Sequence, residues 1–140
     1  MTKVSIIGGG NGGCFTALFL SWFEKDLEVE LIYNPEILPE RVGQATTLEP
    51  PSMLWGSTRF NWYNNPIHAT FKTGILYEGW GKVNDKVFHP FPADKMGMHF
   101  CPWEMQEHVL KSGNLLRGRV KICEIPEERA LDIDLSLIHI

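Results

Sequence analysis

Three features are scarce or missing in this sequence of 140 residues: cysteine, an excess of positive charge, and long apolar runs. The three cysteines, at positions 14, 101 and 123, are odd in number and far apart, so they predict no disulfide framework and fit a reducing cytoplasm. A formal net charge of −4 offers no basic face to nucleic acid. No apolar run reaches the roughly 20 residues that a membrane-spanning helix needs, and there is no secretory signal pattern in the opening residues MTKVSIIGGG. We therefore expect a cytoplasmic protein with no nucleic-acid or membrane partner.

The chain also lacks the length of a typical two-domain enzyme and a recognisable set of metal ligands. Its 140 residues suffice for one domain with a core. His99, Cys101 and His108 come nearest to a metal site, but their spacing matches no zinc pattern. We expect no bound metal.

The first forty residues contain a strand, a glycine-rich loop, a helix and a second strand. The β-branched run at residues 3–7 (KVSII) is typical of a buried parallel strand, and residues 27–33 (LEVELIY) form the second candidate strand. Between them, aromatic and aliphatic residues at helical spacing predict a helix with one apolar face. The residues of that face are Phe15, Leu18, Phe19, Trp22 and Phe23.

The loop after the first strand carries the pattern G-x-G-x-x-G at Gly8, Gly10 and Gly13. In a dinucleotide-binding unit the first glycine permits the tight turn, the second lets the backbone approach a pyrophosphate, and the third lets helix and strand pack closely. Together with Asn11 and Gly12, these glycines are our candidate cofactor-binding residues, because N–H groups at the start of the helix then face the phosphates. A glycine-rich turn with no ligand is the alternative.

The ribose contact of such a site stays open. A dinucleotide site usually has Asp or Glu at the end of the second strand, whereas this strand ends in Tyr33. Asn34 and Glu36 follow it and are the candidate substitutes.

The segment at residues 39–48, PERVGQATTL, resembles the strap of flavin-dependent halogenases, the family typified by tryptophan halogenases. In that family the strap runs G-V-G-E-A-T and passes between the flavin and the substrate site. Arg41 stands in place of the first family glycine and Gln44 in place of the glutamate. Four residues match: Val42, Gly43, Ala45 and Thr46.

A second segment, residues 71–80 (FKTGILYEGW), is similar to the family's F-K-x-x-I-x-F-x-N-W stretch, whose lysine is catalytic. The resemblance therefore implies that Lys72 is catalytic. Residues 70–77 read as one continuous strand, with Lys72 on the same face as Gly74, which would leave room for a ligand. Without the resemblance, Lys72 reads as a solvated lysine on an edge strand.

The resemblance implies an α/β fold: the N-terminal part of a Rossmann-like FAD-binding domain, with parallel strands flanked by helices. It implies that FAD, reduced by a separate flavin reductase, acts with dioxygen and halide to halogenate a small electron-rich aromatic such as tryptophan or another indole. The strap residues Gly43, Gln44, Ala45 and Thr46 would then join the FAD site. His89 and Phe91, in a His-Pro-Phe stretch like that of the family, would line the substrate region. An FAD-dependent aromatic monooxygenase and a non-catalytic nucleotide-binding remnant are the alternative functions.

The C-terminal part predicts a helix at residues 101–111 and a strand at residues 119–125. We expect residues 1–134 to be a truncated N-terminal portion of a halogenase domain that is inactive alone, because the family's tunnel motif and substrate-positioning glutamate do not occur in it. Residues 135–140 (LSLIHI) are what a transposon-end adaptor for sequencing libraries encodes, so we expect a non-native tail. An ordinary apolar strand is the alternative.

Overall fold

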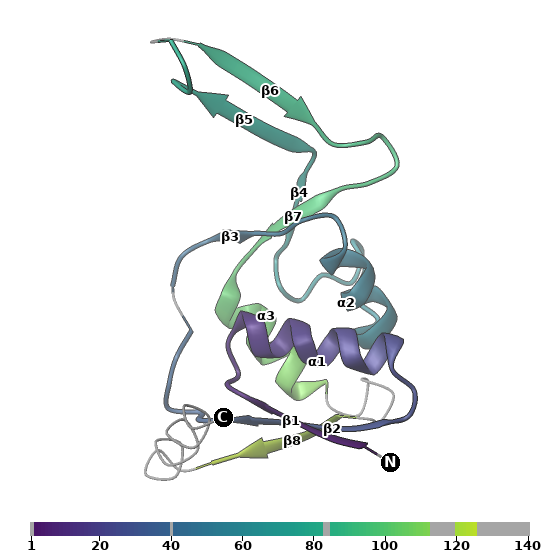
Figure 1. The fold of residues 1–140 in the computed structure, drawn as a ribbon. Coiled ribbons are helices and arrows are strands. Elements are labelled where there is room, and N and C mark those ends of the chain that lie inside the picture. The colour runs from purple at the N-terminus through teal and green to yellow at the C-terminus, as the bar shows by residue number, and fades with distance from the viewer. Residues whose placement is uncertain (1, 40, 83–84, 113–119, 126–140) are drawn as a thin grey trace.

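The N-terminal unit of the computed structural model is a strand–helix–strand arrangement (Figure 1). β1 (Thr2–Ile7) and β2 (Leu27–Tyr33) pair in parallel, in register from Thr2 opposite Leu27 to Ile7 opposite Ile32, and α1 (Asn11–Phe23) connects them. Both predicted strands and the predicted helix are confirmed. The residues described by the structure are 2–39, 41–82, 85–112 and 120–125.

A third parallel strand completes this sheet in the described part of the chain. β8 (Val120–Glu124) pairs with the outer side of β2, which gives the strand order β1-β2-β8. α3 (Pro102–Lys111) precedes β8 and contacts α1, and both helices lie on one side of the sheet (Figure 1). The predicted helix at 101–111 and the predicted strand at 119–125 are thus confirmed. At the ends that the structure describes, their bounds differ from the predicted ones by at most one residue.

A second layer lies on the other side of these helices (Figure 1). Its antiparallel sheet has the order β3-β7-β4 and consists of β3 (Gln44–Ala45), β7 (Gly97–Phe100) and β4 (Thr70–Lys72). α2 (Pro50–Thr58) lies between β3 and β4 in the chain. A hairpin of β5 (Gly74–Glu78) and β6 (Lys86–Pro90) projects from this layer.

The core face of α1 differs from the predicted one. Its buried residues are Cys14, Ala17, Leu18 and Ser21. Of the predicted apolar face, Leu18 is among them, whereas Phe19 and Phe23 are 47% and 56% exposed. The reason is the close approach of the neighbouring helix: the hydroxyls of Ser21 and Ser57 lie 3.3 Å apart. Small side chains fit such a contact and phenylalanines do not.

No helix within the described ranges is long and apolar enough to cross a membrane. The six residues predicted to be a non-native tail, 135–140, lie outside the described residues.

Candidate functional site

The glycine-rich loop between β1 and α1 depends on two glycines for its shape. Gly8 has a φ of +106°, a conformation that side chains disfavour, and its N–H donates to the carbonyl oxygen of Ile32 at 2.8 Å. A Cβ added at Gly13 would collide with the carbonyl oxygen of Gly8. The close approach of α1 to the end of β1 therefore requires glycine at both positions.

Gly10 and Gly12 face open space instead. Apart from chain neighbours and the backbone of α1 itself, no described protein atom lies within 4 Å of a Cβ built at either residue. Gly10 is the N-cap of α1, and no side chain caps the helix with a hydrogen bond. Backbone N–H groups at an uncapped helix start are available to an anion. This loop fits the pyrophosphate of a dinucleotide, because the open space lies at the helix end where glycine leaves the backbone accessible.

The strap (residues 39–48) meets the glycine loop through one pair of side chains. Asn11, the first residue of α1, donates from Nδ2 to Oε1 of Gln44 in β3. The Oδ1 of Asn11 is buried and has no hydrogen-bond partner among the described residues. Buried acceptors without a partner are rare in folded proteins. The junction of strap and glycine loop therefore has an unused acceptor that a ligand could satisfy.

The same strap is fixed to the second layer by Thr46. Its N–H donates to the carbonyl oxygen of Met98 at 2.8 Å, and its Oγ1 accepts from the Met98 N–H at 3.1 Å. Ala45 pairs with His99 on the same strand. Through these contacts, β3 of the strap forms the edge strand of the sheet beside β7. The backbone of the strap is therefore held in a defined position between the glycine loop and Lys72 in the sequence of contacts.

Lys72 contacts the strap at Thr46, whereas the glycine loop contacts it at Gln44. This lysine is the last residue of β4, opposite Gly97 of β7, and its side chain is half-buried. Its Nζ is 3.4 Å from the carbonyl oxygen of Thr46 and 5.5 Å from the centroid of the Phe91 ring. A Cβ at Gly97 would be only 2.8 Å from that same carbonyl oxygen. Glycine at position 97 therefore lets the strap pass close to β7 beside the lysine.

The predicted continuous strand through Lys72 is wrong. The strand breaks at Thr73, so β4 belongs to the β3-β7-β4 sheet and β5 to the hairpin. A Cβ at Gly74 would lie 2.5 Å from the Phe88 ring and 2.6 Å from the His89 carbonyl oxygen. Gly74 thus accommodates the opposite strand of the hairpin. It does not provide the space for a ligand beside Lys72 that the alternating pattern suggested.

The two residues predicted to line the substrate region lie in different surroundings. Phe91 is half-buried, its N–H donates to the Thr73 carbonyl oxygen at 2.7 Å, and its ring faces Lys72. His89 pairs with Ile75 within the hairpin, and its side chain is exposed. The structure therefore brings Phe91, but not the side chain of His89, against Lys72.

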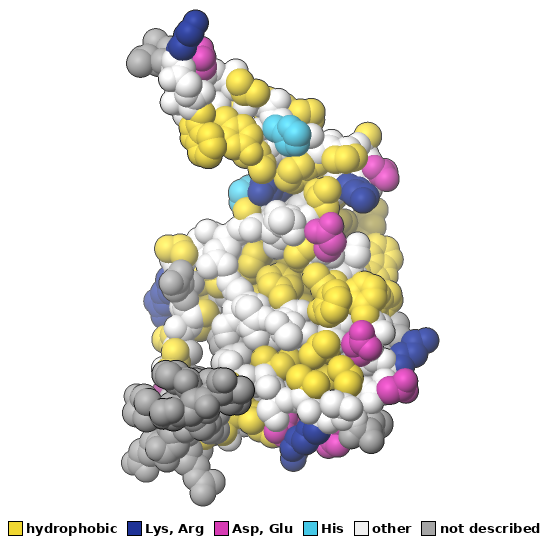
Figure 2. All heavy atoms as spheres, in the orientation of Figure 1, with side chains coloured by type: hydrophobic (Ala, Val, Ile, Leu, Met, Phe, Trp, Pro, Cys, Tyr) yellow, Lys and Arg dark blue, Asp and Glu magenta, His cyan; other side chains and the backbone are white. Residues whose placement is uncertain are grey.

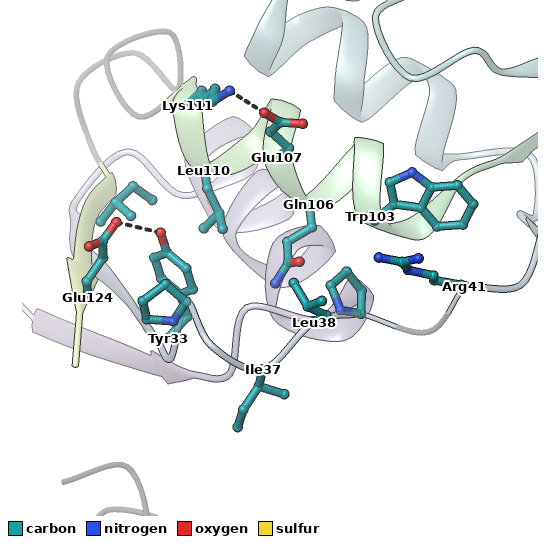
Figure 3. A pocket seen from close by; sticks show the side chains of 13 residues that line it. Tyr33, Ile37, Leu38, Arg41, Trp103, Gln106, Glu107, Leu110, Lys111 and Glu124 are labelled. Carbon is teal, nitrogen blue, oxygen red and sulfur yellow. Dashed lines mark hydrogen bonds and ion pairs between the residues drawn. The ribbon is translucent and has the colours of Figure 1, made fainter. Parts of the chain in front are cut away.

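A cavity of about 750 Å³ opens at the carboxyl ends of β2 and β8 (Figure 3). It lies next to the glycine loop, since a Cβ at Gly9 would be 2.7 Å from the Cβ of Tyr33 and 3.1 Å from Nε2 of Gln106. Its size is that of a small-molecule site. The side chains labelled around it come from β2, the strap and its approach, α3 and β8: Tyr33, Ile37, Leu38, Arg41, Trp103, Gln106, Glu107, Leu110, Lys111 and Glu124.

The rim of this cavity holds a hydroxyl–carboxylate pair. The Tyr33 hydroxyl donates to Oε1 of Glu124 at 2.8 Å. Burial, and then this hydrogen bond, raise the pKa of Tyr33 to about 12, so the hydroxyl keeps its proton at neutral pH. Sequence reasoning missed Gln106 and Glu124, because only tertiary structure brings them to this cavity: α3 packs against α1, and β8 pairs in parallel with β2.

A second, aromatic groove of about 540 Å³ lies between α1, α2 and the segment after α2. Figure 2 shows hydrophobic side chains gathered on this face of the molecule. Trp22, Trp55 and Trp62 line it together with the exposed Phe19 and Phe23. It does not touch Lys72, so we assign it no part in the candidate site.

The remaining titratable groups near the helices are not arranged for metal binding. Burial raises the pKa of Cys14 to about 12, which makes its thiol unreactive. His108 hydrogen-bonds Oγ1 of Thr58 at 2.9 Å, and burial lowers its pKa. Within the described ranges, no three His, Cys, Asp or Glu side chains lie close enough to hold a metal ion.

A parallel β-α-β unit with a glycine loop at the first helix defines the chain as a Rossmann-like α/β protein. A sequence model of the tryptophan halogenase family matches residues 3–131. The chain therefore belongs to the tryptophan halogenase family, as the strap and the lysine segment indicated.

Two curated proteins are similar to the chain, and one of them is named as a tryptophan halogenase. Tryptophan 6-halogenase SttH of Streptomyces toxytricini is 27% identical over 108 residues, which cover 74% of this chain and 21% of the relative. The uncharacterized protein y4xG of Sinorhizobium fredii is 30% identical over 93 residues, which cover 64% of this chain and 18% of the relative. The chain thus spans about a fifth of the length of the curated relatives it matches.

Solved structures of flavin-dependent halogenases share the fold. The tryptophan halogenase of Shewanella frigidimarina superposes with a TM-score of 0.66 at 17% identity, covering 89% of this chain and 36% of that one. Xcc4156, a flavin-dependent halogenase of Xanthomonas campestris, superposes with a TM-score of 0.64 at 17% identity, covering 89% and 35%. The predicted fold class, a Rossmann-like α/β fold with parallel strands flanked by helices, is confirmed.

Proposed function

We propose that the protein carrying this chain is a flavin-dependent halogenase that halogenates an electron-rich aromatic such as tryptophan or another indole. One observation carries this proposal: the strap contacts the glycine loop at Gln44 and the lysine at Thr46. A single residue, Ala45, thus separates the strap residue that contacts the glycine loop from the one that contacts the amine. That is the arrangement needed to pass an oxidant from a cofactor on one side to a substrate on the other.

The cofactor of this proposal is FAD. The residues that would hold it are those of the loop and the strap: Gly8, Gly10, Asn11, Gly12, Gly13, Gly43, Gln44, Ala45 and Thr46. When bound and reduced, FAD supplies the electrons with which dioxygen and halide yield hypohalous acid. The open space at Gly10 and the unpaired Oδ1 of Asn11 support this assignment.

Lys72 is the catalytic residue of the proposal. Its Nζ has three N–H donors, and within the described residues its one hydrogen bond goes to the Thr46 carbonyl oxygen at 3.4 Å, near the upper limit for such a bond. The amine can therefore turn from this weak contact to donate a hydrogen bond to the oxidant. The half-buried position beside Phe91 limits water around it, which strengthens such a bond.

The substrate would lie on the Lys72 side of the strap. Phe91 supports this because its ring already contacts the amine. His89 would line the same region from the hairpin and contribute less, since its side chain is exposed.

We further propose that residues 1–134 are the N-terminal portion of a longer halogenase and that 135–140 are not native. The share of each relative that the chain spans, 18% and 21%, supports the first part of this proposal, and the second part depends on the adaptor-like sequence of residues 135–140 alone. The longer protein would work in the cytoplasm with reduced FAD from a separate flavin reductase. The chain alone is then expected to be inactive.

The test is the identity of the product. The complete protein carrying these residues is supplied with reduced FAD, dioxygen, chloride or bromide, and tryptophan or indole, and the products are analysed by mass spectrometry. A product with the halogen isotope pattern supports the proposal. A product that carries a hydroxyl group and no halogen would show that the protein is a monooxygenase instead. Failure to bind FAD would indicate a non-catalytic remnant.

A further inference from the structure

The strand that should supply the ribose contact of the cofactor ends without an acid. In dinucleotide sites an Asp or Glu about 20 residues beyond the glycines binds the ribose. Tyr33 occupies that position at the end of β2. Its phenol, with a pKa of about 12, carries no charge at neutral pH, so the expected carboxylate must come from elsewhere.

The neighbouring strand, β8, has a carboxylate at the position paired with Tyr33. Glu124 ends β8 and stands directly opposite Tyr33 in the parallel register. Both side chains line the cavity of about 750 Å³ beside the glycine loop (Figure 3). Because the carboxyl ends of parallel strands share one edge, an acid on β8 reaches nearly the same place as an acid on β2.

The two candidates named from the sequence are less suited to this contact. Oδ1 of Asn34 accepts the Glu36 N–H at 2.9 Å and is used in the turn after β2. Asn34 and Glu36 line a separate cavity of about 350 Å³, and neither lines the larger one next to Gly9. Glu124 lines both.

We propose that Glu124 binds the ribose hydroxyls of the cofactor's adenosine and that Tyr33 positions it. This inference rests on the proposed binding of FAD. The Tyr33 hydroxyl donates to Oε1 of Glu124 at 2.8 Å, and no hydrogen bond or ion pair within the described residues reaches Oε2. The carboxylate is therefore held in place by a neutral donor while one oxygen remains available to accept from a ribose hydroxyl. In this proposal the ribose-binding acid is on β8, whereas the usual dinucleotide site has it on β2.

The experiment measures nucleotide binding, so it does not depend on halogenation. Isothermal titration calorimetry compares FAD, ADP, 2′-deoxy-ADP and 3′-deoxy-ADP as ligands of the complete protein. The unmodified protein is expected to bind ADP about tenfold more tightly than at least one deoxy analogue, as for a hydrogen bond to a charged group. Glu124→Gln is expected to weaken ADP by about the same factor and to abolish the discrimination.

Two further variants separate this role from a general effect of charge or stability. Glu28→Gln makes the same charge change at the opposite end of β2, where Glu28 is exposed, and is expected to leave all affinities unchanged. Tyr33→Phe keeps the ring and removes the hydroxyl that orients Glu124. It is expected to reduce the discrimination without abolishing it.

The outcomes distinguish this inference from the proposed function. If the unmodified protein binds FAD and ADP but Glu124→Gln still discriminates against the deoxy analogues, the assignment of Glu124 is wrong and the proposed function stands. If the protein binds neither FAD nor ADP, both are wrong.

Discussion

Gly10→Val adds a branched side chain at the start of α1, where no described atom beyond the adjacent residues lies within 4 Å of the new Cβ. The backbone there has φ −68° and ψ −177°, which a β-branched residue adopts without strain. The cost to folding is then the loss of a favourable N-cap residue, about 1 kcal/mol, or a fall in Tm of about 4 °C for a chain of this size. The same side chain fills the space through which a pyrophosphate would approach. We expect FAD affinity to fall at least about 100-fold, or about 2.8 kcal/mol.

Gly13→Ala is the matched control in the same loop. Its Cβ would collide with the carbonyl oxygen of Gly8, a backbone atom that cannot rotate away. We expect a loss of about 3 kcal/mol of stability, and a Tm lower by about 12 °C. Gly10→Val is therefore expected mainly to lose FAD affinity, and Gly13→Ala mainly to lose stability.

The measurements are thermal unfolding and the quenching of flavin fluorescence on binding. A Gly10→Val protein that binds FAD with unchanged affinity would refute the assignment of this loop. A Gly10→Val protein that loses FAD because it unfolds, with a Tm as low as that of Gly13→Ala, would instead contradict the open space described at Gly10.

Two further predictions concern stability. Gly74→Ala should destabilise the β5–β6 hairpin by about 2 kcal/mol, because its Cβ would lie 2.5 Å from the Phe88 ring. Hydrogen exchange at the amides of Ile75 and Tyr77 should accelerate while FAD affinity is unchanged. Unaltered exchange would contradict the packing described. Burial lowers the pKa of His108 below its ordinary 6.5, so the native state binds fewer protons than the unfolded chain once the pH falls below that value. The free energy of unfolding should therefore be unaffected by His108 above pH 6.5 and should fall below it, by at most about 1.4 kcal/mol per pH unit. Denaturant unfolding between pH 7.5 and 5.5 checks this, and His108→Gln should show a smaller fall; an equal fall would assign the dependence to other groups.

The elements near the N-terminus were predictable because their signals are local. The β-branched run of β1 and the alternation of β2 each determine a strand within a few residues, and Gly8 and Gly13 are needed by a turn that the motif itself describes. The inward face of α1 was not predictable from the same residues. Phe19 and Phe23 have the right spacing, but the contact between Ser21 and Ser57 requires small side chains, and that contact depends on a helix distant in sequence.

In the candidate site, too, features with a local sequence signal were predictable and features set by tertiary contacts were not. Lys72 and Thr46 were named from short motifs, but the break at Thr73 was not, because the period of two continues through it. Pairing with β7 ends at Gly97, and only that tertiary contact ends β4. Glu124 had no signal in the sequence that marks it, since its place beside Tyr33 is set by the order of strands in the sheet.

The most direct test of the account is the halogenation of substrate by Lys72→Ala. In the complete protein with reduced FAD, dioxygen, halide and tryptophan or indole, we expect this variant to bind FAD normally and to yield no halogenated product. Lys86→Ala removes a lysine that pairs with Glu78 on the hairpin and should keep the activity. A Lys72→Ala protein that halogenates at near the unmodified rate would contradict the central claim that this amine, held against the strap at Thr46, acts on the oxidant.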